Sequence, residues 1–184
     1  PAARIRIGSV SKGFTAAMLA ALVADGRADP DAAVQTYVPE FPRKQWEITL
    51  RQLATHTSGL RHYDFGNFNE ANNTVHYARL SDALSLFADD PLVSRPGEAV
   101  HYSSFGYNLL GVAIERIEGT SYGEALRRLV TAPLGLDSVG LDDAHAKVPC
   151  RTAFYSNTFG WLQTATVKRD SSDYYPSGGL VATS

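Results

Sequence analysis

Apolar residues recur every three or four positions in three segments, which predicts that helices dominate the fold. The first segment runs from Ser11 to Asp25, and Gly26 follows it as a C-terminal stop. Its apolar positions define the expected buried face: Phe14, Ala17, Met18, Ala21 and Leu22. Residues 105–118 and 122–130 have the same periodicity, so we expect two further helices there.

Shorter elements are predicted between these helices. Residues 50–56, with Thr49 as the cap, and residues 81–87 are typical of short helices. Residues 4–8 alternate between polar and apolar side chains, which indicates a strand that ends just before the first helix. Residues 27–47 contain three prolines and are predicted to form an ordered connector without regular structure.

Three segments lack a helical period. Residues 61–76 are rich in Asn, His and aromatic side chains and predict a long loop, a kind of segment that is often functional. Residues 151–167 have a β-like pattern, with a hairpin turn expected at 157–160. The final residues, 176–184, are interpreted as a glycine-rich lead into a helix.

Composition narrows the class of protein. The 184 residues are 44% hydrophobic, which is enough for one core and one domain. The net charge is -2 and there is no basic excess, which argues against a nucleic-acid partner. No apolar run approaches the roughly 20 residues that span a bilayer. Cys150 is the only cysteine, which excludes an intrachain disulfide. The chain opens at Pro1 rather than Met, so we expect residues to precede it.

Ser9 and Lys12 stand where the predicted strand meets the first helix. Three residues apart, their Cβ atoms lie about 5–6 Å from each other on one face. A serine hydroxyl needs a neighbour to take its proton before it attacks a carbonyl. Lysine can do so only when neutral, with its pKa well below about 10.4. Burial and the helix dipole both act in that direction, so the pair is a candidate nucleophile and base.

Tyr102, Ser103 and Ser104 directly precede the second long helix. A tyrosine beside a lysine can accept a proton and return it to a leaving group. In a purely structural interpretation, Tyr102 is a half-buried aromatic at a strand end and Ser104 caps the helix. The two interpretations are compatible, and these residues alone leave both open.

Four segments, in this order, resemble the motifs of the serine β-lactamase and penicillin-binding-protein family: residues 8–42, 48–60, 95–122 and 176–184. That family includes class C β-lactamases, family VIII esterases and D-alanyl-D-alanine peptidases. The stretches VQTYVPEFP, SGLRHYD and DPLVSRPGEAVHYSSFGYNLL are similar to the mitochondrial serine β-lactamase-like protease and its bacterial relatives. The resemblance implies an α+β fold of the β-lactamase/transpeptidase-like type, here mainly helical and lacking most of the antiparallel sheet.

The resemblance also implies roles for particular residues. The family's nucleophile falls on Ser9, its conserved lysine on Lys12 and its catalytic tyrosine on Tyr102. Ser104 stands where the family usually has an Asn that contacts the substrate amide. A hydroxyl lacks the two-way hydrogen bonding of that amide, which disfavours a β-lactam substrate and favours another acyl substrate.

No metal or organic cofactor is expected. His56 matches the family's His-Thr-Ser-Gly stretch, where we interpret it as a structural residue that ties a loop. His62 and Asp64 follow no ligand spacing with His56, so surface roles are favoured for them.

The resemblance further implies that residues 1–184 are part of a domain. The family's third motif, Lys-Thr-Gly or His-Thr-Gly, is absent from the chain. We therefore expect N-terminal strands and C-terminal sheet strands to lie outside this sequence. Most bacterial relatives are periplasmic or membrane-attached, which is the only indication of location.

The sequence therefore predicts a serine hydrolase that forms an acyl-enzyme with an amide or ester: a peptide, a peptidoglycan stem, a small ester or a β-lactam. The first alternative is a non-catalytic binding or self-assembling protein that retains the fold. Its interface would use aromatic residues of the long loop and its edge: Tyr63, Phe65, Phe68 and Tyr77. The second alternative is a plain esterase.

Overall fold

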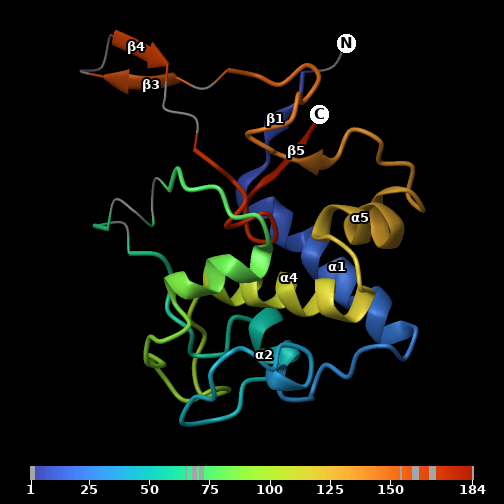
Figure 1. The fold of residues 1–184 in the computed structure, drawn as a ribbon, viewed down its shortest axis with the longest axis vertical. Helices are drawn as coiled ribbons and strands as arrows, with labels where there is room; N and C mark the ends of the chain where they lie inside the picture. Colours follow the sequence, from blue (N-terminus) through green and yellow to red (C-terminus); the bar gives the residue numbers. More distant parts are fainter. Residues whose placement is uncertain are drawn as a thin grey trace.

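The computed structural model describes residues 3–64, 66–67, 70, 73–153, 155–158, 162–165 and 169–183. A body of helices lies beneath a small sheet, and a separate hairpin projects from the sheet side (Figure 1). The α-helices are α1 (Ser11–Ala24), α2 (Leu50–Ala54), α4 (Ser104–Glu118) and α5 (Tyr122–Leu126). Single-turn and irregular helices are η1 (Gly8–Val10), η2 (Val34–Thr36), η3 (Leu80–Leu86) and η4 (Arg127–Thr131).

Helix α4 is the centre of the core. It contacts α1, α2, α5 and η3, and its residues from Ser104 to Ile114 are all buried. The apolar side chains of these elements form one continuous cluster, as expected for a single domain. The predicted helices at 11–25, 50–56 and 105–118 are confirmed, with Thr49 capping α2 through a hydrogen bond from Gln52 N. None of the described helices is both long and apolar enough to cross a membrane.

The buried face of α1 differs from the predicted one. Ala17 is exposed and Phe14 is only half-buried, whereas three polar residues, Ser11, Lys12 and Thr15, are buried together with the apolar Met18, Leu19 and Leu22. Thr15 turns inward because its hydroxyl donates to Pro176 O (2.6 Å) and lies 2.7 Å from Tyr122 Oη. Buried polar groups need such partners, and here they rotate the helix so that Lys12 faces inward.

The end of the chain forms a strand, so the predicted helical lead at 176–184 is wrong. Strand β5 (Leu180–Ala182) lies between β1 (Ile5–Arg6) and β2 (Gly140–Leu141), and both neighbours run antiparallel to it. All three residues of β5 are buried. A short apolar run in a sequence is compatible with either a buried strand or a helix. Here the segment is a strand because it pairs with β1 on one edge and with β2 on the other.

Two other predictions need correction. The helix predicted at 81–87 forms as η3 (Leu80–Leu86), which is a 3₁₀ rather than an α-helix. The hairpin at 151–167 exists as β3 (Tyr155–Thr158) paired antiparallel with β4 (Leu162–Ala165). However, 157–158 belong to β3, and 159–161 lie outside the described residues. Tyr122–Val130 is helical as predicted, but it widens into a π-turn in η4.

Gly111 allows the segment that precedes β5 to pack directly on α4. A Cβ placed at Gly111 would lie 2.1 Å from Pro176 Cγ and 3.1 Å from Leu80 Cδ2. Only hydrogen fits in that space, so Gly111 fixes how closely Pro176 and the adjoining Ser177 approach the helical body.

Replacing Gly111 with Ala should therefore lower the free energy of unfolding by about 1–3 kcal/mol, because the added methyl group displaces Pro176. Urea denaturation measures this change. Gly13→Ala in α1 is the matched control, since a Cβ there meets nothing within 4 Å. A Gly in a helix interior costs roughly 0.5–1 kcal/mol relative to Ala, so the control should be neutral or stabilising. Equal effects of both changes would contradict this account.

Candidate active site

The turn between β1 and α1 places Ser9 at the surface. Gly8 adopts a left-handed φ of 51°, which the lack of a side chain permits at low cost. The chain then makes the single 3₁₀ turn η1 and enters α1, so Ser9 is exposed while Lys12 lies in the first turn of α1. Lys12 is only 6% exposed and faces the interior below Ser9.

The polar ends of the three predicted catalytic residues converge. Lys12 Nζ lies 3.4 Å from Ser9 Oγ, and Tyr102 Oη lies 2.7 Å from the same oxygen. Lys12 Nζ also donates to Ser104 Oγ (3.0 Å) and to the main-chain carbonyl of Ser177 (2.7 Å). These contacts join η1, α1, the start of α4 and the segment before β5 around one ammonium group.

Burial lowers the pKa of Lys12 below its usual value, although the hydrogen bond and charge of Tyr102 oppose that shift. Burial raises the pKa of Tyr102, but hydrogen bonds with Lys12 and Ser9 and the lysine charge outweigh it, so the net pKa is lowered. Both shifts favour the loss of one proton from the pair. Because the groups are coupled, that proton belongs to Lys12 and Tyr102 together.

Tyr102 is held between two histidine rings. The ring of His56 lies 4.5 Å from that of Tyr102, centroid to centroid, and the ring of His62 meets it edge-on at 5.2 Å. His56 Nδ1 also accepts a hydrogen bond from Ser103 N (3.1 Å), and His56 O accepts one from His101 N (2.8 Å). His56 thus ties the segment that carries Tyr102, the structural role expected for it.

Ser103, not Ser104, caps α4. Ser103 Oγ accepts from Gly106 N (3.0 Å) and donates to Arg61 O (2.7 Å). The alternative in which Ser104 serves only as a helix cap is therefore wrong. Ser104 is instead the first residue of the helix, and its hydroxyl reaches Lys12.

His62 and Tyr63 are part of the site, which the sequence interpretation missed. His62 Nδ1 accepts from Ser104 N (3.2 Å), so a neutral ring carries its proton on Nε2. Burial, followed by the charge of Lys12, lowers the pKa of His62 and favours that neutral form. Tyr63 Oη lies 3.3 Å from Ser177 Oγ and accepts from Asn108 Nδ2 at the same distance. The only sequence signal for either residue was its place in the loop after Ser-Gly-Leu.

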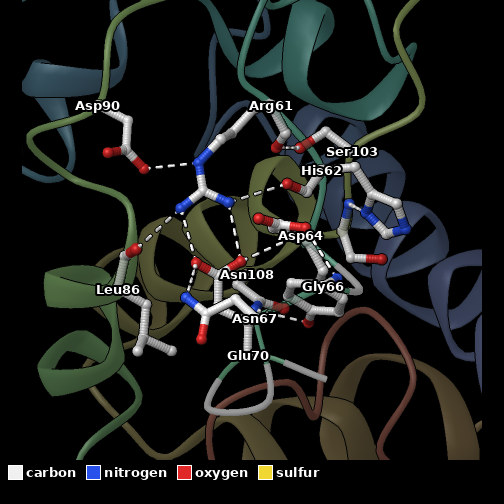
Figure 2. A network of polar contacts seen from close by, with 12 residues as sticks. Arg61, His62, Asp64, Gly66, Asn67, Glu70, Leu86, Asp90, Ser103 and Asn108 are labelled. Atoms are coloured by element: carbon white, nitrogen blue, oxygen red, sulfur yellow. Dashed lines mark hydrogen bonds and ion pairs between the residues drawn. The ribbon is translucent and has the colours of Figure 1, made fainter.

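Arg61 anchors the loop that carries these two residues (Figure 2). Its guanidinium forms two hydrogen bonds with the buried carboxylate of Glu70 (2.8 and 2.9 Å) and one with Asp90 (2.7 Å). It also donates to the carbonyls of His62 and Leu86. The hydrogen bonds from Arg61 hold the pKa of Glu70 below its usual value. The hydrogen bonds of the Arg61 guanidinium therefore fix the first residues of this loop against the rest of the protein.

Replacing Arg61 with Leu should lower the free energy of unfolding by about 2–3 kcal/mol, because the buried Glu70 carboxylate would lose its charged partner and keep only Asp64 N and Asn67 Nδ2 as donors. Chemical denaturation measures the loss. The matched control is Arg79→Leu, which breaks an exposed pair with Asp82 and should cost at most about 1 kcal/mol. A loss for Arg61→Leu no larger than the control would show that the network does not hold the loop.

A cleft of about 260 Å³ opens beside Ser9. Its walls come from β1 and η1, the loop after Gly59, the start of α4 and the segment before β5. The lining residues are Arg6, Gly8, Ser9, His62, Tyr63, Tyr102, Ser104, Arg169, Tyr174, Ser177 and Gly178. A carbonyl compound that entered this cleft would meet the Ser9 hydroxyl directly.

Known proteins share this sequence pattern and fold. The Beta-lactamase family model matches residues 1–184. The mitochondrial serine beta-lactamase-like protein LACTB of Homo sapiens is 28% identical over 195 residues, which cover 70% of this chain and 36% of that protein. The chain thus spans about a third of that relative's length.

Two solved structures superimpose on nearly the whole chain. A D-stereospecific amidohydrolase from Streptomyces sp. is 26% identical with a TM-score of 0.81, covering 99% of this chain and 58% of that one. A D-amino acid amidase from Ochrobactrum anthropi is 25% identical with a TM-score of 0.80, covering 98% and 52%. The fold is therefore β-lactamase/transpeptidase-like, as predicted. Because the family model covers the entire sequence, the chain belongs to the Beta-lactamase family.

Proposed function

We propose that this chain carries the nucleophile and the proton-transfer groups of a serine hydrolase that works through an acyl-enzyme. The supporting observation is the convergence of Lys12 Nζ and Tyr102 Oη on Ser9 Oγ, at 3.4 and 2.7 Å. An exposed hydroxyl with a buried amine and a phenol at hydrogen-bond range is the arrangement that an activated serine requires.

In the first half-reaction, Ser9 Oγ attacks the substrate carbonyl carbon and gives its proton to the Lys12–Tyr102 pair. The tetrahedral oxyanion takes up hydrogen bonds from backbone N–H groups, including that of Ser9. The bond to the leaving amine or alcohol then breaks, and the pair returns the proton to that leaving group. In the second half-reaction, water attacks the acyl-enzyme, and the same pair takes the water proton and gives it to Ser9 Oγ.

The substrate is an amide or an ester, and a peptide-like amide is favoured over a β-lactam. Ser104, which replaces the family's usual Asn, is buried, and its short side chain is directed to Lys12. It does not supply the two-way amide contact that an Asn would offer to a β-lactam. Two solved structures of similar fold have amide-hydrolysing names, which agrees with this order.

A fluorophosphonate probe tests the proposal. The probe should add covalently to the protein, and mass spectrometry of proteolytic fragments should place the adduct on the peptide that contains Ser9. Turnover of short peptides against p-nitrophenyl esters then separates a peptidase from the plain esterase. A protein that stays unlabelled under conditions where a known serine hydrolase reacts would contradict the proposal.

Replacing Tyr102 with Phe should lower the rate of probe labelling about 100-fold, at the low end of the range for groups that transfer protons. The ring and its contact with the His56 ring are retained, so folding should not change. The matched control is Tyr37→Phe. It removes a phenol hydroxyl that lies far from the active site and accepts a hydrogen bond from Asp29 N. Stopped-flow or gel-based labelling rates compare the two, and equal rates would remove Tyr102 from the proton-transfer step.

Self-association stays a prediction. Of the aromatic residues expected at its interface, Tyr63 points into the protein and not toward a partner. Tyr63 is turned inward, where its hydroxyl contacts Ser177 and Asn108, while Phe65 and Phe68 lie outside the described residues. Light scattering on the eluting protein would determine the oligomeric state independently of any catalytic assay.

A further inference from the structure

Two histidines and one aspartate meet away from the Ser9 cleft. His76 Nδ1 and His145 Nε2 each lie 3.0 Å from the same oxygen of Asp170, Oδ2. All three potential ligand atoms lie within 4.8 Å of one another. The residues come from three separate segments: the stretch before η3, the loop after β2 and the stretch before Ser177. None of them lines the cleft beside Ser9.

Local contacts hold the group in this arrangement. Asp170 Oδ1 accepts from Ser172 N (2.9 Å), which leaves Oδ2 directed at the imidazoles. The backbone next to His76 is fixed because Tyr77 N donates to Ser172 Oγ (2.9 Å). His145 lies in a bend in which its own N–H donates to Asp143 Oδ1 (2.7 Å). Each of the three segments is therefore held in place by its own hydrogen bond, independently of the contacts among the three side chains.

The donors and their exposure suit a metal ion. The Asp170 side chain is 4% exposed, whereas those of His76 and His145 are 45% and 64% exposed, so an ion could enter from solvent. Two imidazole nitrogens and one carboxylate oxygen are ligands typical of Zn²⁺, with bonds of about 2.0–2.2 Å. Tetrahedral bonds of that length put ligand atoms about 3.4 Å apart. Here each ring nitrogen lies 3.0 Å from Asp170 Oδ2, and all three atoms lie within 4.8 Å of one another, so small side-chain shifts would admit an ion.

We propose that His76, His145 and Asp170 form a binding site for a divalent cation of the zinc class. The ion takes the place of the two ring N–H donors that now face Asp170 Oδ2. Each neutral imidazole moves its proton to its other nitrogen, and His76 coordinates through Nδ1 and His145 through Nε2. The remaining coordination positions face solvent.

The ion would link segments that build the active-site walls. His76 lies in the chain segment that begins with His62 and Tyr63, and Asp170 directly follows Arg169 of the cleft. Because its ligands come from both segments, the bound ion would join the long loop to the stretch before β5. An ion that binds only the folded protein also raises the free energy of unfolding. It is a structural site, separate from the proton-transfer groups at Ser9.

Calorimetric titration of the chelator-treated protein with Zn²⁺ tests the site. We expect one ion per chain and a higher melting temperature with Zn²⁺. Co²⁺ should give visible absorption bands typical of nitrogen and oxygen ligands. His76→Ala and His145→Ala should each weaken Zn²⁺ binding by at least 10-fold and remove the Co²⁺ bands. Both side chains are exposed, so neither change should disturb folding.

His101→Ala is the matched control, because His101 lies outside the group and should leave Zn²⁺ affinity unchanged. Asp170→Asn keeps the shape of the side chain and should also weaken binding, with circular dichroism as the check on folding. The proposal is overturned if Zn²⁺ does not bind saturably, or if affinity in the two histidine variants equals that of the unaltered protein. The three residues would then form only a hydrogen-bonded cluster.

Discussion

Ser9→Ala should abolish covalent labelling by a fluorophosphonate and lower hydrolysis by on the order of 10⁶-fold, the loss found when a serine nucleophile is removed. The reason is geometric. Ser9 Oγ is the exposed oxygen on which Lys12 Nζ and Tyr102 Oη converge, and alanine offers no atom for attack. Mass spectrometry of the intact protein after probe treatment measures the adduct directly.

The control for this change is Ser85→Ala, which removes an exposed serine whose hydroxyl donates only to Asp82 O. Labelling of that variant should match the unaltered protein. Thermal unfolding of Ser9→Ala should stay close to that of the unaltered protein, because its side chain is exposed. Persistent labelling of a folded Ser9→Ala protein would assign the nucleophile to another residue.

Lys12→Arg should lower labelling by about 10⁴-fold, at the upper end for a group that transfers protons. Arginine retains the positive charge but does not lose its proton in proteins, so it cannot act as a base. The measurement is the labelling rate over a range of pH. In the unaltered protein the rate should rise with pH as the Lys12–Tyr102 pair loses its proton, and in the variant this rise should be absent.

Two comparisons separate this effect from misfolding. Lys44→Arg replaces a lysine that also donates to main-chain carbonyls, those of Ala88 and Asp90, and should leave labelling unchanged. Lys12→Ala leaves space for a small primary amine, so added propylamine should restore part of the rate. Full activity in Lys12→Arg would show that a permanently charged group is sufficient, which excludes Lys12 as a base.

The arrangement of helices could be predicted because periodic apolar residues and end signals agree. Helix α4 ends at Glu118 with Gly119 as its C-cap, and α2 begins after Thr49, as their sequences indicate. The strand at Leu180–Ala182 could not be predicted, because its pairing partners, residues 5–6 and 140–141, lie far away in the chain. The rotation of α1 was also hidden, since the partners that bury Thr15 lie more than 100 residues further along.

The active-site residues that lie in recognisable sequence motifs could be predicted. Those that reach the site only because distant segments pack together could not. Ser9 and Lys12 are neighbours on one turn, and Tyr102 was found through the family resemblance. The Ser177 carbonyl that accepts from Lys12 belongs to the backbone, which no residue type reveals. The sequence favours a surface role for His62, because its contact with Ser104 N exists only after the loop folds against α4.

The most direct test of the account is the titration of Lys12 itself. The chain has four lysines, so ¹³C-labelled lysine gives few signals, and Lys12→Arg assigns the signal of Lys12 by its loss. Because burial outweighs the effect of Tyr102, the Lys12 amine should titrate below its ordinary pKa of 10.5. A Lys12 signal that titrates at or above 10.5 would contradict the claim that this lysine loses its charge and activates Ser9.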